Sequence, residues 1–176
     1  MKRKSSPILR QVIDTVILTA LIFLFLITFV IQGYKVYGSC MEPNLQSGER
    51  LLGNKLIYHF AKPNRGDVIV FRYPKDPRKI FVKRVVALPG EIVEIRKGIL
   101  YINGKPLDER RYLKNAPKDP RGDLSQHRVA PGHLFVLGDN RDQSNDSRSW
   151  GDLPIEDVQA KVWIRYWPLT RCAIIN

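Results

Sequence analysis

A cysteine and a lysine are the two residues of this chain best suited to do chemistry together. Cys40 lies in residues 38–43, which read GSCMEP, and Lys83 lies in residues 81–84, which read FVKR. A thiol beside a neutral lysine supplies a nucleophile and a base without histidine. The function therefore depends on whether Cys40 is that nucleophile, a lipid attachment site or a structural cysteine.

The surroundings of Lys83 favour a buried amine. In a strand, Lys83 shares a face with Phe81 and Val85. If that face is buried, desolvation penalises the ammonium form, and a neutral lysine can accept a proton. Arg84 would then point to the opposite face and need a carboxylate partner there.

A polar segment, residues 138–151 with the sequence GDNRDQSNDSRSWG, supplies candidate partners for Arg84. They are Asp139, Asp142 and Asp146. The acids are closely spaced, but a calcium loop is excluded because Arg141 takes a ligand position and a central glycine is missing. Arginines among acids indicate ion pairs that would hold a loop rigidly beside a site.

Each of these segments also has an ordinary structural interpretation when taken alone: a turn, an exposed strand and a polar loop. A Ser-His-Asp triad would draw on His59, His127 or His133, but no serine lies in a nucleophile-elbow context. Only the combination of the three segments favours a catalytic site over these structural interpretations.

The N-terminus predicts a membrane anchor. Residues 16–31 carry no charge, and with Val12 and Ile13 the run approaches the roughly 20 residues that span a bilayer. We expect a transmembrane helix over 12–32, a cytoplasmic basic segment over 1–11 and an outer domain over 33–176, because basic residues precede the run: Lys2, Arg3, Lys4 and Arg10.

Two other N-terminal interpretations compete with an uncleaved anchor. A cleaved signal peptide has a shorter apolar region and a small-x-small site, which this chain lacks. A lipoprotein signal fits the small residues before Cys40. However, Tyr37 stands where a branched aliphatic residue is expected, and the cysteine is well separated from the apolar run.

Charge and cysteine content exclude several function classes. The net charge is +12, but the basic residues are interspersed with acids and form no basic helix, which disfavours a nucleic-acid partner. An anionic membrane surface explains the charge better. Two cysteines, Cys40 and Cys172, are too few for a disulfide scaffold or a zinc site, and we do not expect them to pair.

The outer domain is predicted to be mainly β, with antiparallel, folded-over sheets. Apolar and alternating runs bounded by turn residues predict the strands 50–53, 67–73, 79–87, 92–96, 99–102, 133–137 and 158–167. Asn103-Gly104 is a strong tight-turn signal. Residues 105–128 are polar and charged and are expected to form an exposed loop or insertion. Parallel α/β is disfavoured because crossover helices are missing.

The anchor and the three segments together resemble type I signal peptidases, the membrane-bound serine-lysine endopeptidases. The resemblance extends to about Trp167. Residues 138–151 match the third family box, G-D-N-R-D-x-S-x-D-S-R-x-W-G, at every fixed position, and 83–91 match the second. The first box, S-M-x-P-T-L, departs twice: Cys40 replaces the serine nucleophile and Asn44 the threonine. A natural difference and an engineered substitution are both compatible with Cys40.

The resemblance implies roles for individual residues. Cys40, rather than its neighbour Ser39, would be the nucleophile and Lys83 the general base. Ser144 would orient the lysine amine by a hydrogen bond. The Cys40 N–H would stabilise the oxyanion, and Gly38 stands where some members place a serine as second donor. The supporting ion-pair cluster would be Asp146, Arg148 and Arg84. Shallow pockets for small side chains would be lined by Val36, Met41, Leu45, Phe81 and Val82.

The function that follows is removal of N-terminal signal peptides from exported precursors after small residues, as in Ala-x-Ala, by acyl-enzyme chemistry without metal or cofactor. The expected partners are secretory precursors and the lipid bilayer, and the location is the plasma or inner membrane. The alternatives are a membrane-anchored β domain that binds substrate with little catalysis, because Cys40 replaces serine, and a self-cleaving repressor-type protease, which lacks an anchor.

Overall fold

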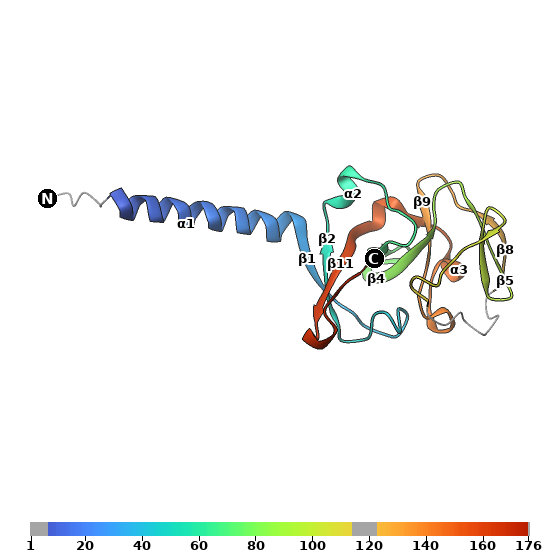
Figure 1. Cartoon of the computed structure of the whole chain (residues 1–176). Coiled ribbons are helices and arrows are strands. Elements are labelled where there is room, and N and C mark those ends of the chain that lie inside the picture. The colour runs from blue at the N-terminus through green and yellow to red at the C-terminus, as the bar shows by residue number, and fades with distance from the viewer. Residues whose placement is uncertain (1–6, 114–122, 176) are drawn as a thin grey trace.

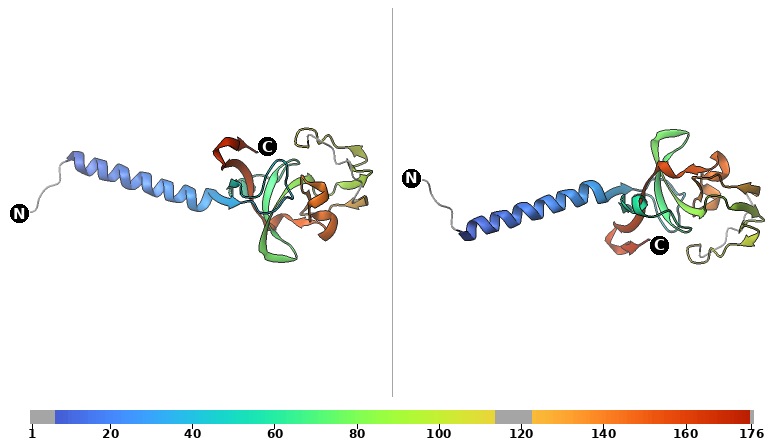
Figure 2. Two further views of the ribbon diagram at one scale, coloured as in Figure 1. Left: turned by 90° about the horizontal axis from the view of Figure 1, so that it is seen from below. Right: turned by 90° about the horizontal axis from the view of Figure 1, so that it is seen from above.

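A long helix projects from a β-rich body in the computed structural model, which describes residues 7–113 and 123–175 (Figure 1). The helix α1 (Pro7–Phe25) continues as a π-helical turn, η1 (Leu26–Val30). Residues Pro7–Val30 are long and apolar enough to cross a membrane, by length and composition, and none is buried. The views from below and above agree that the helix leads away from the body (Figure 2).

The helical segment is shifted relative to the predicted span 12–32. It begins at Pro7, and the chain is already a strand, β1 (Ile31–Lys35), at its other end. Pairing of Tyr34 with Leu51 across β1 and β2 (Arg50–Asn54) takes the backbone out of the helix. The strand therefore follows the anchor helix with no intervening linker. Part of the predicted cytoplasmic segment, residues 1–6, lies outside the described residues.

The larger sheet has eight strands, and every pair is antiparallel, which confirms the predicted fold class. Its order is β1-β2-β11-β3-β4-β9-β10, with β12 beside β11. The further strands are β3 (Val68–Tyr73), β4 (Asp76–Ala87), β9 (His133–Leu137), β10 (Leu153–Pro154), β11 (Val158–Trp167) and β12 (Ala173–Ile174). Short helices complete the body: α2 (Ile57–Phe60), η2 (Arg141–Gln143), α3 (Ser147–Trp150), η3 (Ile155–Asp157) and η4 (Leu169–Arg171).

The smaller sheet has four strands in the order β7-β6-β5-β8. They are β5 (Ile92–Arg96), β6 (Ile99–Ile102), β7 (Lys105–Pro106) and β8 (Leu124–Arg128). The prediction of an exposed loop over 105–128 is therefore wrong at both ends, which form strands, and at Leu113, which is buried. The central part, residues 114–122, lies outside the described residues.

The core is divided by β3, whose side chains alternate between two faces of the large sheet. Val68 and Val70 pack in a cluster with Met41 and Leu45, whereas Ile69 and Phe71 pack on the other face. This alternation is the two-residue period of a strand. A third cluster joins the small sheet to the ends of β4 and β9. The cluster with Met41 lies beneath the segment that carries Cys40, so this segment rests on a packed core.

Candidate active site

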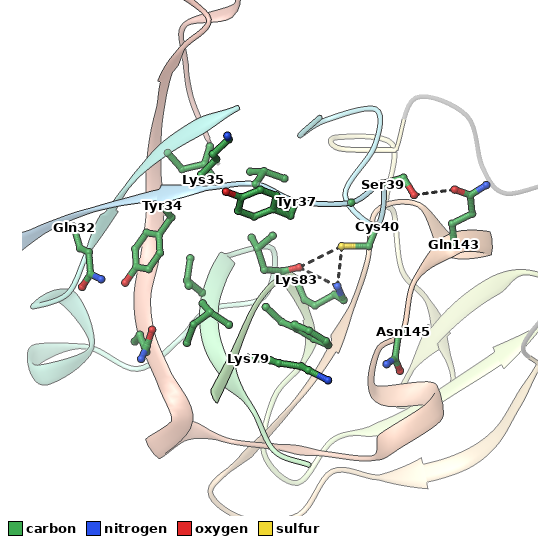
Figure 3. Close-up of a pocket in the computed structure, with 18 residues that line it drawn as sticks. Gln32, Tyr34, Lys35, Tyr37, Ser39, Cys40, Lys79, Lys83, Gln143 and Asn145 are labelled. Atoms are coloured by element: carbon green, nitrogen blue, oxygen red, sulfur yellow. Dashed lines mark hydrogen bonds between the residues drawn. The ribbon is translucent and has the colours of Figure 1, made fainter. Parts of the chain in front are cut away.

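Cys40 and Lys83 lie in direct contact. The Lys83 Nζ donates to the Cys40 Sγ at 2.9 Å and to the Val82 carbonyl oxygen at 3.1 Å (Figure 3). Lys83 is 3% exposed, and its Nζ is 5.2 Å from the centre of the Phe81 ring. The predicted burial of the lysine on the face of Phe81 is confirmed. A thiol and an amine at this distance can exchange a proton directly.

The Cys40 segment is held by the polar loop that follows β9. The Asn140 N–H donates to the Cys40 carbonyl at 3.0 Å, and the Asn140 side chain donates to the Ser39 carbonyl at 3.1 Å. The Ser39 hydroxyl donates to Gln143 at 2.8 Å, in this same loop (Figure 3). Ser39 therefore contributes to the loop contact, while the Cys40 Sγ contacts Lys83.

Gly138 allows this loop to approach the nucleophile closely. A Cβ at residue 138 would lie 2.2 Å from the Ser144 Oγ and 2.4 Å from the Cys40 carbonyl oxygen, closer than real Cβ contacts. The buried Ser144 Oγ has no hydrogen-bond partner among the described residues. The predicted hydrogen bond from Ser144 to Lys83 is therefore wrong for this structure, because the amine is engaged by Cys40 and Val82.

The predicted ion-pair cluster consists of two separate pairs. Arg84 makes a bidentate contact with Asp139, with both bonds at 2.8 Å and both side chains almost fully buried. Asp146 is bound by Arg148 through two bonds at 2.9 Å. The grouping of Arg84 with Asp146 was wrong. Arg84 pairs in register with Leu137, the last residue of β9, and Asp139 follows two residues later.

A cleft of about 880 Å³ opens beside the dyad. Val36, Phe81 and Val82 line it as predicted, together with Cys40 and Lys83. Met41 and Leu45 do not: they are 0% and 1% exposed and lie in the core cluster beneath. The floor of the cleft is therefore apolar, and the two residues support its shape from below.

The cleft extends from the dyad to the strand that follows the anchor helix. Gln32, Tyr34 and Lys35 of β1 line its far end (Figure 3). Because β1 begins directly after η1, this end of the cleft lies next to the end of the candidate membrane span. A peptide segment that leaves a membrane beside this helix would therefore lie next to the cleft.

The backbone N–H groups of Gly38 and Cys40 differ in availability. The Gly38 N–H donates to the Ser47 hydroxyl at 3.3 Å. The backbone N–H of Cys40 has no hydrogen-bond partner within the described part of the chain. A free N–H at the nucleophile is the geometry that stabilises developing negative charge on an attacked carbonyl.

Two further polar residues near the site, Glu109 and Tyr112, were not predicted from the sequence, and Asn44 was noted only as a departure from the first family box. Glu109 binds Arg141 through both guanidinium nitrogens, and Asn44 donates to the Tyr112 carbonyl at 2.7 Å. A possible signal was Tyr112-Leu113, an apolar pair inside a charged stretch. Within the described ranges no group of three or more potential metal ligands occurs, and both cysteines are free.

The family match and the similar curated proteins point to one family. The family described as "Signal peptidase, peptidase S26" matches residues 9–167. Signal peptidase I of Bacillus caldolyticus is 43% identical over 155 residues, which cover 82% of this chain and 84% of that protein. A probable signal peptidase I-1 of Synechocystis is 37% identical over 170 residues, covering 93% and 85%. The crystal structure of a signal peptidase I from Enterococcus faecalis is 35% identical, covers 57% of this chain and 97% of that chain, and has a TM-score of 0.48.

Proposed function

We propose that the chain, which belongs to the signal peptidase family, peptidase S26, cleaves its substrates with Cys40 and Lys83 as the catalytic dyad. The chain is a hydrolase that removes signal peptides. The observation that supports the dyad is the 2.9 Å contact between the Lys83 Nζ and the Cys40 Sγ at the edge of the cleft.

Acylation begins with transfer of the Cys40 proton to Lys83. The sulfur then attacks the carbonyl carbon of the scissile peptide bond, and a C–S bond forms as the carbonyl becomes an oxyanion. The Cys40 N–H donates to that oxyanion. When the C–N bond breaks, Lys83 returns the proton to the leaving amine, and the mature protein departs with a new N-terminus. The signal peptide remains as a thioester on Cys40.

Deacylation needs Lys83 in its neutral form. Lys83 takes a proton from a water molecule, the resulting hydroxide attacks the thioester, and the proton passes to the Cys40 sulfur as the C–S bond breaks. A thiol gives up its proton far more readily than a serine hydroxyl. Because Lys83 has given its proton to the leaving amine, it is neutral in the acyl-enzyme and can activate this water.

The substrate is proposed to bind as an added strand along β4. Residues 79–83 of β4 line the cleft, and β9 begins to pair with β4 only at Arg84. The edge of β4 beside the dyad is therefore open to an extended peptide. Apolar walls at Val36 and Val82 would accept small side chains before the cut, as in Ala-x-Ala.

The proposed domain division follows from the same arrangement. The basic N-terminus would be cytoplasmic, the membrane span would lie within the helical residues Pro7–Val30 instead of 12–32, and residues 33–176 would form the catalytic domain on the outer side. The cleft begins next to the end of the span. A precursor whose apolar segment is still in the bilayer would then present its cleavage site directly to Cys40. Secretory precursors and the bilayer are the partners that this geometry suits.

A substrate-binding domain with little catalysis is not favoured by the family match over 9–167. The deciding experiment compares four full-length proteins in detergent with a precursor substrate: the given chain, Cys40→Ser, Cys40→Ala and Lys83→Ala. We expect Cys40→Ser to cleave rapidly and the two alanine variants to be inactive. Full cleavage by Lys83→Ala would overturn the dyad, and full cleavage by Cys40→Ala would overturn the nucleophile.

A further inference from the structure

A short segment between β7 and residue 113 contacts three parts of the active site: the Cys40 segment, the strand β4 and the loop after β9. Its two polar anchors are Glu109 and Tyr112, which lie three residues apart and are joined by a 2.9 Å hydrogen bond from the Tyr112 hydroxyl to the Glu109 carboxylate. Leu113 beside them is only 6% exposed. The segment is therefore packed onto the body rather than carried loosely on its surface.

The first contact reaches the loop that holds the nucleophile. Glu109 receives bonds from the Arg141 guanidinium at 2.5 and 3.0 Å, and both side chains are largely buried. Arg141 also donates to the Gly138 carbonyl at 2.9 Å. Between these two residues lies Asn140, whose N–H holds the Cys40 carbonyl. Glu109 thus fixes the turn that fixes the nucleophile.

The second contact reaches the strand that carries the lysine. The Tyr112 ring lies 4.2 Å from the Arg84 guanidinium carbon, in cation–π geometry. Arg84 follows Lys83 in β4, and its charge is matched by Asp139 at 2.8 Å. Tyr112 therefore covers the buried pair that sets the position of this part of β4.

The third contact reaches the segment that carries Cys40, through Asn44. The Asn44 amide donates at 2.7 Å both to the Tyr112 carbonyl and to Asp139. Asn44 stands where the resemblance implies a threonine, and a side chain with two amide N–H groups can serve both acceptors at once. The Cys40 segment, β4 and the loop after β9 are thus bridged by one element.

Two members of this cluster, Tyr112 and Arg141, have a raised pKa. Burial and the neighbouring Glu109 carboxylate raise the pKa of Tyr112 far above its ordinary value, so its hydroxyl remains a donor. Burial opposes the charge of Arg141, but the bonds and charge of Glu109 outweigh it and raise the pKa of the guanidinium. Tyr112 and Arg141 therefore keep their protons, and with them their hydrogen bonds to Glu109, around neutral pH.

We propose that Glu109 and Tyr112 are positioning residues for the dyad, acting through Arg141 and through Arg84 and Asn44. This inference rests on the proposed function of the site. Small errors in the placement of reacting groups cost large factors in rate. Loss of either residue should therefore lower kcat more than it changes KM, because neither residue lines the cleft.

The test uses full-length protein in detergent with a Cys172→Ser background, since Cys172 is exposed and would also react with thiol reagents. Glu109→Ala and Tyr112→Leu are expected to lower kcat on the order of tenfold, with KM changed less. Alkylation of Cys40 by iodoacetamide at neutral pH should slow as well, because Lys83 is no longer held against the sulfur. Tyr112→Phe keeps the ring on Arg84 and should retain most activity.

Asp108→Ala is the matched control, because the Asp108–Arg110 pair is adjacent in sequence but exposed. It should leave kcat and alkylation unchanged. The proposal is overturned if Glu109→Ala and Tyr112→Leu both keep kcat within twofold of the parent. It is also overturned if Asp108→Ala lowers kcat as much as these two variants do. If the truncations do not fold, Glu109→Gln decides: it keeps the size but removes the charge, and an unchanged kcat rejects the proposal.

Failure of this inference is distinguishable from failure of the dyad. The alkylation rate of Cys40 needs no turnover, so it reports on positioning even if the parent cleaves slowly. If the parent protein loses cleavage on Cys40→Ala, while the Glu109 and Tyr112 variants keep the parent's kcat and alkylation rate, only the positioning role of Glu109 and Tyr112 is rejected. If Cys40→Ala cleaves the precursor as fast as the parent protein, the proposed dyad is rejected instead.

Discussion

The Lys83 Nζ lies 2.9 Å from the Cys40 Sγ, although 43 residues separate them in sequence. Both atoms also approach the Val82 carbonyl oxygen, at 3.1 Å and 3.9 Å. One backbone oxygen therefore helps to aim the amine at the sulfur.

Removing the lysine should make the thiol less reactive at neutral pH. In Lys83→Met, whose unbranched side chain is one atom shorter and cannot take a proton, we expect Cys40 to be alkylated at least about tenfold more slowly. The measurement is iodoacetamide labelling followed by peptide mass spectrometry. Lys79→Met is the control, because Lys79 lines the same cleft but pairs with Asp76 at 3.5 Å. Equal labelling of both variants would argue against proton transfer to Lys83.

Breaking the buried Arg84–Asp139 pair should be costly for stability. Arg84→Ala leaves an almost fully buried carboxylate without its guanidinium, and losses of roughly 3–5 kcal/mol are typical of such changes. Thermal unfolding of the full-length protein in detergent is the measurement. Arg110→Ala removes an exposed guanidinium and should leave the unfolding midpoint in place. Equal midpoints for the two variants would show that the buried pair does not stabilise the site.

A single methyl group at residue 138 should displace the nucleophile. In Gly138→Ala the new Cβ collides with the Ser144 side chain and the Cys40 carbonyl, so we expect cleavage to fall by roughly a hundredfold. Gly33→Ala is the control, because its Cβ would meet only the Tyr166 hydroxyl, at an ordinary 3.8 Å. Steady-state cleavage of a precursor measures both. Normal activity in Gly138→Ala would mean that the loop can retreat without moving Cys40.

The proposed orientation of the chain in the membrane can be tested with a native cysteine. Cys172 is exposed and lies near the C-terminus, in the domain that we place outside the membrane. In a Cys40→Ser background, a membrane-impermeant maleimide should label Cys172 in intact cells. Labelling that appears only after the membrane is opened would place this domain in the cytoplasm.

Sequence reasoning located the strands best where side-chain pattern and turn chemistry agreed. The strands β5, β6, β9 and β11 were predicted with their observed bounds. The turn between β6 and β7 has positive φ angles at Asn103 and Gly104, as the Asn-Gly pair predicts. The strand β8 was missed because most of its residues are exposed, so no apolar period marks it.

The site was predictable where residue type alone carried the chemistry. Cys40 and Lys83 were singled out before their contact was known, and Asp139 was among the candidate partners of Arg84. The roles of Glu109 and Tyr112 were not predictable, because their partners lie in other segments and depend on how these segments pack. The same holds for the Ser144 hydroxyl, whose buried position against Gly138 depends on a backbone approach that no spacing reveals.

The most direct test of the dyad is the intact mass of the enzyme during turnover. The full-length chain is mixed with a precursor in detergent, quenched with acid and analysed by mass spectrometry. We predict an added mass equal to that of the released signal peptide less one water, attached to Cys40 as a thioester, and its absence from Cys40→Ala and Lys83→Ala. Cleavage by the given chain that continues without any adduct on Cys40, and equally fast in Cys40→Ala, would contradict the account.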